Sequence, residues 1–268
     1  MKVFLENLKP NMNPYNGKGK FIDRLANELK KQGVEIVDNP KVCDINLCMN
    51  SLPKYDYGIK VTRLDDVAFS NDIIHKNIYR KGLRKTQFAI KTADAIIYQS
   101  KVAKNTNEGI LNIKAKKDTI IYNGTNPQKH KQEFIKLPVG KNFIHASQIL
   151  FPQRRVDILL ECWGEFIQDK DDVYLHLVHD RNEDFENIDL TKHKNVLYHD
   201  IMVQEDLDRF VYSCDAAISI KYQDSCPNFI IESIAVGTPV ITTNTNGLAE
   251  ILNEPQVIVA NVDPYYTH

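Results

Sequence analysis

The sequence contains no apolar stretch long enough to cross a membrane. No window approaches the roughly 18 uninterrupted apolar residues that a membrane helix needs. The N-terminal stretch MKVFLENLKPN has too short an apolar segment for a secretory signal, so a cytoplasmic location is expected. Low-complexity segments and short tandem repeats are also missing. With 268 residues, 43% of them apolar, the chain is expected to form one large globular domain or two small ones.

The sequence contains few cysteines, and their spacing does not match a known paired motif. The five cysteines form an odd set without a C-x-x-C pair. This arrangement argues against a disulfide framework and against a cysteine-rich zinc site, and reduced thiols are expected. The cysteines are Cys43, Cys48, Cys162, Cys214 and Cys226.

Recognisable metal and phosphate motifs are also missing. His176 and His179 lie three positions apart in an expected strand, where they point to opposite faces and cannot share one ion. The glycine-rich NGKGK at residues 16–20 matches neither the phosphate-loop nor the dinucleotide pattern. No metal site is therefore predicted.

The net charge of −1 conceals two halves of opposite sign. Residues 1–140 hold 25 Lys+Arg and 14 Asp+Glu, a balance of +11, which leaves 9 and 21 for residues 141–268, a balance of −12. The basic half is a candidate surface for an anionic membrane or an anionic acceptor, and the alternative is that the two lobes partly neutralise each other. Nucleic-acid binding is not expected, because aromatic residues do not interleave with the basic ones.

Strand-like and helix-like segments alternate along both halves of the chain. This pattern predicts an α/β fold with two successive Rossmann-like domains, residues 1–128 and 141–268, joined by a polar linker over 129–140. Ligands are expected at the carboxyl ends of the strands, in a cleft between the domains. Strands are predicted at 1–7, 34–37, 43–50, 58–64, 94–100, 118–124, 142–148, 172–180, 195–200, 215–220 and 239–243, and helices at 21–33, 71–93, 154–169, 203–214 and 227–237.

The segment from Gln223 to Leu252 combines a helix with two carboxylates near its beginning. Pro227 suits a helix start, Gly237 a helix end, and Asp224 and Glu232 fall near the N-terminal end. The free amide hydrogens of a helix N-terminus suit a phosphate, and a carboxylate beside it can accept hydrogen bonds from a sugar diol. Together these features favour a nucleotide-sugar.

The same segment resembles the signature of the family 4 glycosyltransferases. That pattern is an acidic residue, seven others, a Glu, then Ala-x-Gly-x-Pro-Val and Gly-x-x-Glu. The resemblance implies a GT-B fold, with two Rossmann-like α/β/α domains facing across a cleft, and retaining, metal-independent chemistry. The matching positions are Pro227, Asn228, Glu232, Ala235, Gly237, Pro239, Val240, Gly247 and Glu250.

The resemblance also assigns roles on the donor side. It implies that Glu232 holds the ribose hydroxyls and that Asp224, where the family more often has Glu, contacts the transferred sugar. FPQRRVDILLECW is similar to the family's segment with a basic phosphate-binding residue, which puts Arg154 against the diphosphate as the leaving group departs. Arg155, where the family has glycine, is a second candidate for this charge or else a solvated residue. Backbone amides from Ser225, Cys226, Pro227 and Asn228 complete the implied donor site.

On the acceptor side the implied residues belong to the first half of the chain. Gly17 and Gly19 lie in the segment that resembles the family's glycine loop, and Asp65 follows a strand that resembles one of the acceptor domain. Each retains a plain alternative, a flexible loop for the glycines and a surface turn for Asp65.

The function predicted is transfer of a hexose from a UDP- or GDP-linked sugar to a glycan, lipid-linked or other hydroxyl acceptor, without metal or cofactor. Its partners are then the nucleotide-sugar, the acceptor and, through the basic half, an anionic membrane surface. The alternative is a catalytically weak nucleotide-sugar-binding subunit of a larger assembly. A sugar-nucleotide epimerase on the same fold lacks a distinctive residue here.

Overall fold

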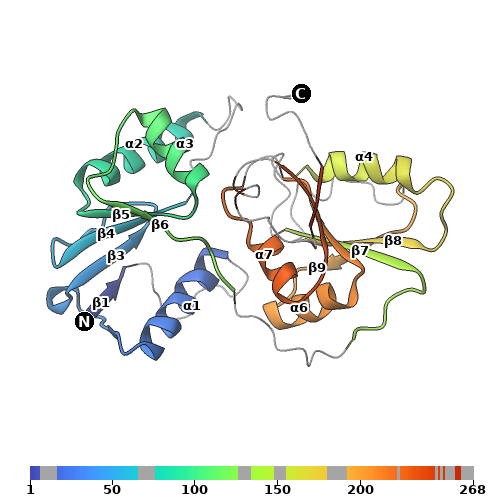
Figure 1. The fold of residues 1–268 in the computed structure, drawn as a ribbon, viewed down its shortest axis with the longest axis horizontal. Coiled ribbons are helices and arrows are strands. Elements are labelled where there is room, and N and C mark those ends of the chain that lie inside the picture. Colours follow the sequence, from blue (N-terminus) through green and yellow to red (C-terminus); the bar gives the residue numbers. More distant parts are fainter. Residues whose placement is uncertain are drawn as a thin grey trace. The chain divides into compact units, whose positions relative to one another are not determined.

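The chain forms two compact units, Met1–Tyr122 and Asn123–His268. The computed structural model shown in Figure 1 describes residues 1–6, 17–65, 76–125, 134–147, 155–179, 192–221, 224–244, 247, 250 and 257–260. The predicted boundary at residue 128 and the predicted linker over 129–140 stay predictions, and part of that linker lies outside these ranges.

The first unit is built on a six-stranded sheet in the order β2-β1-β3-β4-β5-β6. Every neighbouring pair is parallel. Each predicted strand of this half is therefore confirmed, with shorter bounds. The strands are β1 Lys2–Leu5, β2 Glu35–Ile36, β3 Ile45–Met49, β4 Ile59–Leu64, β5 Ala95–Tyr98 and β6 Asp118–Ile120.

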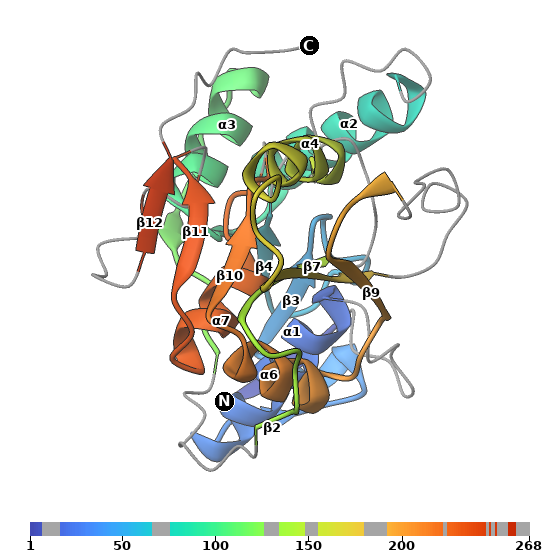
Figure 2. The same cartoon turned by 90° about the vertical axis from the view of Figure 1, so that its right-hand side faces the viewer.

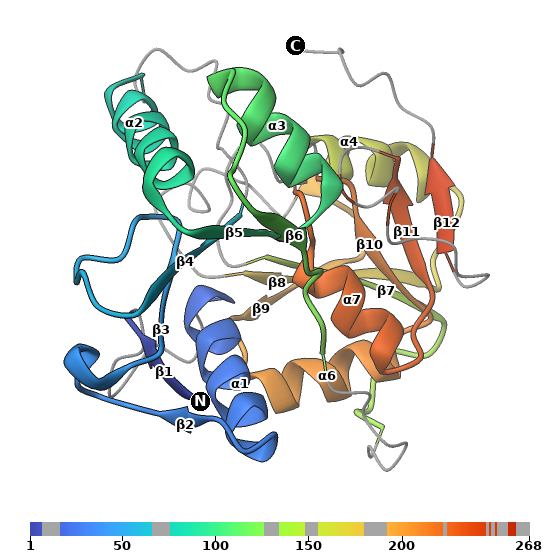
Figure 3. The same cartoon turned by 60° about the vertical axis from the view of Figure 1, so that its left-hand side comes forward.

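Helices cover both faces of this sheet. Helix α1 (Gly17–Lys31) packs Ile22 and Ala26 against strands β1 and β3, while α2 (Lys76–Thr92) packs Ile90 against β4 and β5. Figure 3 shows α1 on one face and α2 with α3 (Lys101–Leu111) on the other. A short 3₁₀ helix, Pro40–Val42, precedes β3. A parallel sheet is buried on both of its faces, so it requires an apolar layer of helices on each side.

Two features of the first unit differ from the sequence-based expectation. Helix α1 begins at Gly17 rather than at residue 21, so the NGKGK segment enters the helix instead of forming only a loop. Helix α3 was not predicted, although Ser100 caps it by accepting a hydrogen bond from the Ala103 amide at 2.9 Å. A serine immediately before a helix is a recognised N-cap signal.

The second unit contains another all-parallel six-stranded sheet, in the order β12-β11-β10-β7-β8-β9. The order, counted from β7 as the first strand, is that of the doubly wound nucleotide-binding fold. Five of its strands were predicted and the edge strand β12 was not. The strands are β7 Lys141–Ser147, β8 Val173–His179, β9 Val196–Asp200, β10 Ala216–Ser219, β11 Val240–Thr243 and β12 Val257–Ala260.

Among the described residues, helices α4, α6 and α7 cover this second sheet, and Figure 2 shows them beside its strands. Helix α4 (Val156–Phe166) packs Leu160 and the buried Trp163 on one face. On the other face, α6 (Gln204–Ser213) and α7 (Asn228–Ala235) share a second core cluster. Successive strand residues alternate between the two clusters, as the pleat requires: in β10, Ala217 belongs to one and Ile218 to the other.

Within the described residues, no helix is long and apolar enough to cross a membrane. All five cysteines are free thiols, and Cys162 on α4 is the exposed one. The predicted fold class, two parallel-sheet α/β units, is confirmed.

The predicted separation of the two strand histidines is also confirmed. The Nδ1 atom of His176 lies 2.9 Å from Nε2 of His199, and its Nε2 atom lies 2.9 Å from the Asn142 carboxamide oxygen. The ring of His179 instead lies beside that of His145. In the described ranges, no group of three or more His, Cys, Asp or Glu side chains could hold a metal ion. Burial, with a smaller contribution from His199, lowers the pKa of His176 from 6.5 to about 4.

This shift predicts a pH-dependent stability. Between pH 6.5 and about 4 the unfolded chain binds a proton at His176 that the folded chain does not, so stability is full above pH 6.5 and falls as the pH decreases through this window. The loss from this group is at most about 3 kcal/mol. In His176→Gln, urea unfolding at pH 7.5, 6, 5 and 4.5 should show a shallower pH slope. An unchanged slope would contradict the assignment.

Candidate functional site

The strand order of the second unit locates its ligand-binding edge. Neighbouring strands β7 and β10 connect to helices on opposite faces, and ligands of doubly wound sheets bind beyond the carboxyl ends at such a switch point. The segment after β10 contains Lys221 and Asp224 and leads directly into α7. The sequence signature is therefore located where this fold binds nucleotides.

Asp224 is held by two contacts from its own loop. Its Oδ1 accepts a hydrogen bond from the Cys226 amide at 3.3 Å, and its Oδ2 lies 3.1 Å from the Lys221 ammonium nitrogen. The side chain of Lys221 is 7% exposed and that of Asp224 is 20% exposed. A buried ammonium group needs such a carboxylate partner, because its desolvation would otherwise be costly.

Sequence reasoning did not single out Lys221. The available signal was a lysine directly after an apolar strand and three residues before the first acidic position, in SIKYQD. Its position introduces a second basic residue beside the predicted donor site, in addition to Arg154.

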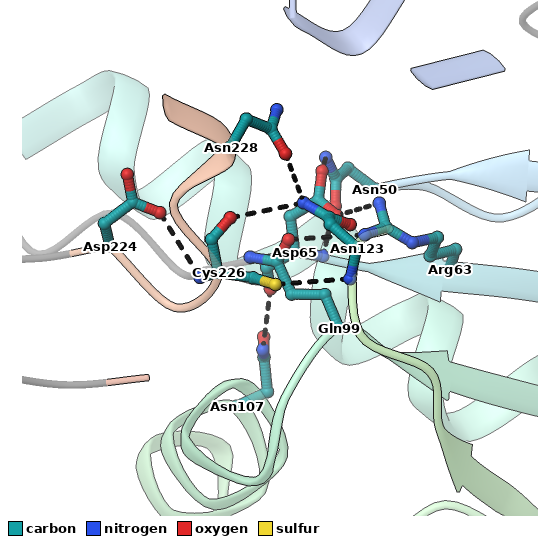
Figure 4. Close-up of polar contacts among 9 residues, drawn as sticks. All are labelled: Asn50, Arg63, Asp65, Gln99, Asn107, Asn123, Asp224, Cys226 and Asn228. Atoms are coloured by element: carbon teal, nitrogen blue, oxygen red, sulfur yellow. Dashed lines mark hydrogen bonds and ion pairs between the residues drawn. The ribbon is translucent and has the colours of Figure 1, made fainter. Parts of the chain in front are cut away.

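The backbone of the loop before α7 is in close contact with other segments at Ser225 and Cys226. A Cβ atom at Gly247 would lie 1.8 Å from the carbonyl oxygen of Ser225, so the two backbones are in close contact. The amide of Asn123 donates to Cys226 Sγ at 3.2 Å, and its side chain donates to the Cys226 carbonyl at 3.2 Å. Figure 4 draws the contacts of Asn123. Ser225 and Cys226 are both buried.

This geometry distinguishes among the backbone amides that the sequence implied for phosphate binding. The Cys226 amide donates to Asp224, and Pro227, the residue that precedes α7, carries no amide hydrogen. These two nitrogens are therefore the weakest candidates for phosphate contact. Asn228 is the first residue of α7, where amide hydrogens have no partner within the helix.

Glu232 lies one turn into α7 and is partly buried. It is four residues after Asn228, which places both side chains on one face of the helix, about 6 Å apart along the axis. A phosphate at the helix N-terminus and a ribose beside Glu232 fit this spacing.

The structure describes one of the two arginines that were predicted to bind phosphate. Arg154 lies outside the described residues. Arg155 directly precedes α4 with φ 53° and ψ 39°, in the left-handed region, and its side chain makes no capping hydrogen bond. That conformation favours glycine, which is the residue usual at this position in the family that the sequence resembles.

In the first unit, Asp65 is the centre of a polar network at the carboxyl end of the sheet. Its carboxylate is paired with the buried Arg63 and accepts a hydrogen bond from the Asn50 side chain at 2.9 Å. The Asn50 oxygen accepts from the Asp65 amide at 2.8 Å, and Asn107 donates to the Asp65 carbonyl at 3.1 Å. Gln99 accepts from Arg63 at 3.3 Å. These contacts are drawn in Figure 4.

This network holds the Asp65 carboxylate in a fixed orientation, through the Arg63 guanidinium and the Asn50 side chain. Carboxylate oxygens held in this way suit accepting a hydrogen bond from a substrate hydroxyl. Asp65 remains 27% exposed in its side chain and can therefore be reached. Arg63 was not predicted, and neither were Asn50 and Gln99.

The predicted glycines belong to the beginning of α1. Gly17 starts the helix and Gly19 is buried in its first turn. The same end of α1 carries Phe21, whose ring lies 4.0 Å below the Arg63 guanidinium carbon. The first turns of α1 are therefore close to the Asp65 network.

Comparison with known proteins points to one class. Residues 140–265 match the family model described as glycosyl transferases group 1. No curated protein sequence matches the chain. Solved structures with a similar fold include WaaG, a glycosyltransferase involved in lipopolysaccharide biosynthesis, with a TM-score of 0.73 and 16% identity over 97% of this chain and 86% of that one.

Two further structures share the fold. Anabaena HepE, solved in complex with UDP-glucose, has a TM-score of 0.65 and 13% identity over 97% of this chain and 85% of its own. TarM has a TM-score of 0.59 and 14% identity over 80% of this chain, which spans 44% of TarM. These similarities confirm the GT-B architecture of two α/β domains.

The close contact at Gly247 makes a testable prediction. Gly247→Ala should lower the free energy of unfolding by about 1–3 kcal/mol, because the new methyl group overlaps the Ser225 carbonyl. Gly164→Ala is the matched control, since its Cβ would meet nothing within 4 Å inside α4 and should stabilise the protein by about 0.5–1 kcal/mol. Chemical denaturation measures both. Equal effects of the two substitutions would contradict the contact.

Arg155 makes a second prediction. Arg155→Gly should raise the free energy of unfolding by about 1 kcal/mol relative to Arg155→Ala, because both remove the charge but glycine alone relieves the left-handed backbone. Denaturation of the two variants measures this difference. An alanine variant as stable as the glycine variant would show that the backbone conformation differs from the one described.

Proposed function

We propose that this chain is a glycosyltransferase that takes its sugar from a nucleoside-diphosphate sugar. The observation that carries the proposal is the position of the Asp224–Glu232 signature, at the carboxyl end of β10 and the N-terminus of α7. The group 1 family match over residues 140–265, a range that includes the signature, also supports it. HepE, whose structure was solved with UDP-glucose, gives a precedent for the ligand on this fold.

In the proposed donor site each part of the nucleotide has a chemical partner. Glu232 accepts hydrogen bonds from the ribose diol, and the N-terminus of α7 receives the diphosphate. Arg154 and Lys221 supply positive charge to the departing diphosphate, so the proposed reaction requires no metal or cofactor. Asp224 contacts the sugar that is transferred. UDP and GDP are the proposed carriers.

We propose a retaining reaction of the family 4 type. The acceptor oxygen bonds to the anomeric carbon on the face from which the diphosphate leaves, while the bond from that carbon to the phosphate oxygen breaks. The acceptor's proton passes to an oxygen of the departing diphosphate.

The acceptor is proposed to bind at the Asp65 network of the first unit. Asp65 and Asn50 offer an acceptor and a donor group of the kind that orient carbohydrate hydroxyls. Gly17 and Gly19 are proposed to border the same site. The excess of basic residues in the first half suits a glycan or lipid-linked acceptor presented at an anionic membrane surface.

The alternative, a subunit that binds nucleotide-sugar without transferring it, would use the same donor site. The Lys221–Asp224 ion pair favours this alternative, because the carboxylate that would contact the sugar is already bonded to the lysine. Turnover separates the two: release of UDP or GDP from the corresponding sugar nucleotides by the purified chain supports the transferase. Binding of the sugar nucleotide with no release, in the presence of glycan and lipid-linked acceptors, supports the subunit.

Substitution of the two signature carboxylates should affect different steps. Glu232→Ala should abolish the thermal stabilisation by UDP or GDP, which for wild type at 100 times the dissociation constant is about 2.7 kcal/mol. Asp224→Ala should retain most of that stabilisation and lose turnover instead. Glu161→Ala, an exposed position on α4, is the control for a lost glutamate. Wild-type nucleotide binding by Glu232→Ala would refute the proposed donor site.

A further inference from the structure

Asn123 reaches the loop before α7 from more than one hundred positions earlier in the sequence. It is the first residue of the second unit, directly after Tyr122. Its side-chain nitrogen donates to the Cys226 carbonyl at 3.2 Å and to the Asn228 side-chain oxygen at 2.8 Å. Its backbone amide donates to Cys226 Sγ at 3.2 Å. One residue thus contacts both the loop and the first residue of the helix.

These contacts determine how two carboxamides are oriented. The Cys226 carbonyl can only accept a hydrogen bond, so Asn123 must present its nitrogen to the loop. That same nitrogen faces Asn228, which must therefore present its oxygen in return. The amide nitrogen of Asn228 is then directed away from Asn123, as Figure 4 shows.

The orientation matters because of where Asn228 lies. It is the first residue of α7 and follows Pro227, which has no amide hydrogen and makes no side-chain capping bond. Its side-chain nitrogen therefore adds two N–H donors at a helix end that lacks a backbone donor at the preceding position. Donors and the positive end of the helix dipole together favour an anion.

The other carboxylate of the signature identifies which anion fits. Glu232 lies on the same helical face, about 6 Å further along α7, and suits a diol rather than a phosphate. A ligand with a phosphate at Asn228 and a ribose at Glu232 has the dimensions of a nucleoside diphosphate.

We propose that Asn123 is a positioning residue that locks the Asn228 carboxamide with its nitrogen toward the donor diphosphate. Asn228 makes the phosphate contact, and Asn123 acts through it. This inference rests on the proposed function, because it assigns a further contact within the same donor site.

The test is a double-mutant cycle read by nucleotide affinity. Asn228→Ala removes the phosphate donor and should weaken UDP or GDP binding about tenfold, as the loss of one charge-assisted hydrogen bond does. Asn123→Asp cannot donate to Asn228, so the Asn228 amide turns, and its oxygen faces the phosphate. This variant should weaken binding by tenfold or more although Asn228 is intact.

The double variant discriminates positioning from general loop support. Adding Asn123→Asp to Asn228→Ala should change affinity by less than about twofold, because no carboxamide is left to orient. A further loss equal to that of Asn123→Asp alone would overturn the proposal and leave Asn123 as support for the loop. Asn123→Ala, which has neither a side-chain donor nor a charge, is carried through the same cycle, so that the negative charge of Asn123→Asp or a failure of that variant to fold does not decide the result.

Two controls separate this inference from the proposed function. The affinity for uridine or guanosine, which lack phosphate, should be the same in wild type and Asn228→Ala. Wild-type protein that binds neither UDP nor GDP would refute the proposed function itself. Wild-type protein that binds the diphosphate with an affinity unchanged in Asn228→Ala would refute the positioning role alone.

Discussion

The close contact between the backbones of Gly247 and Ser225 is the constraint on which the second unit's proposed chemistry depends. No side chain larger than hydrogen fits at Gly247, so the loop after β10 can lie against the segment that follows β11. Asn123 holds the next residue, Cys226, from the other direction in sequence. A loop restrained in this way can present Asp224 and the first turn of α7 with little reorganisation, which is what preorganised electrostatic stabilisation requires.

Charge is arranged differently in the two units. In the first, the Asp65 carboxylate is paired with Arg63 and Asn50, and its proposed role is to orient a hydroxyl. In the second, Lys221 is buried against Asp224, beside the proposed position of the departing diphosphate. A lysine beside a carboxylate can still stabilise an additional anion at short range, since the local dielectric is low. One network belongs to the proposed acceptor site and the other to the proposed donor site.

The sequence alone was sufficient for the fold class and for the helix that carries the signature, whereas the donor site stays a prediction. Buried parallel strands are recognised in the sequence by their runs of apolar and β-branched residues. The proline, glycine and acidic positions of the signature are recognised by their spacing. The unpredicted features have physical reasons. Helix α3 has the sequence KVAKNTNEGIL, with asparagine and glycine, both poor helix formers, in its interior, and β12 is a four-residue edge strand. The contacts of Asn123 with Cys226 and of Arg63 with Gln99 join residues far apart in the sequence, which no periodicity encodes.

The central claim is that the N-terminus of α7 binds the diphosphate of a nucleotide whose ribose is held by Glu232. It is tested most directly by a crystal structure of the chain soaked with UDP or GDP. Density is expected for the terminal phosphate within hydrogen-bond distance of the Asn228 nitrogens and for the ribose hydroxyls on the Glu232 carboxylate. A nucleotide bound elsewhere on the second unit, with Glu232 and Asn228 uncontacted, would contradict it.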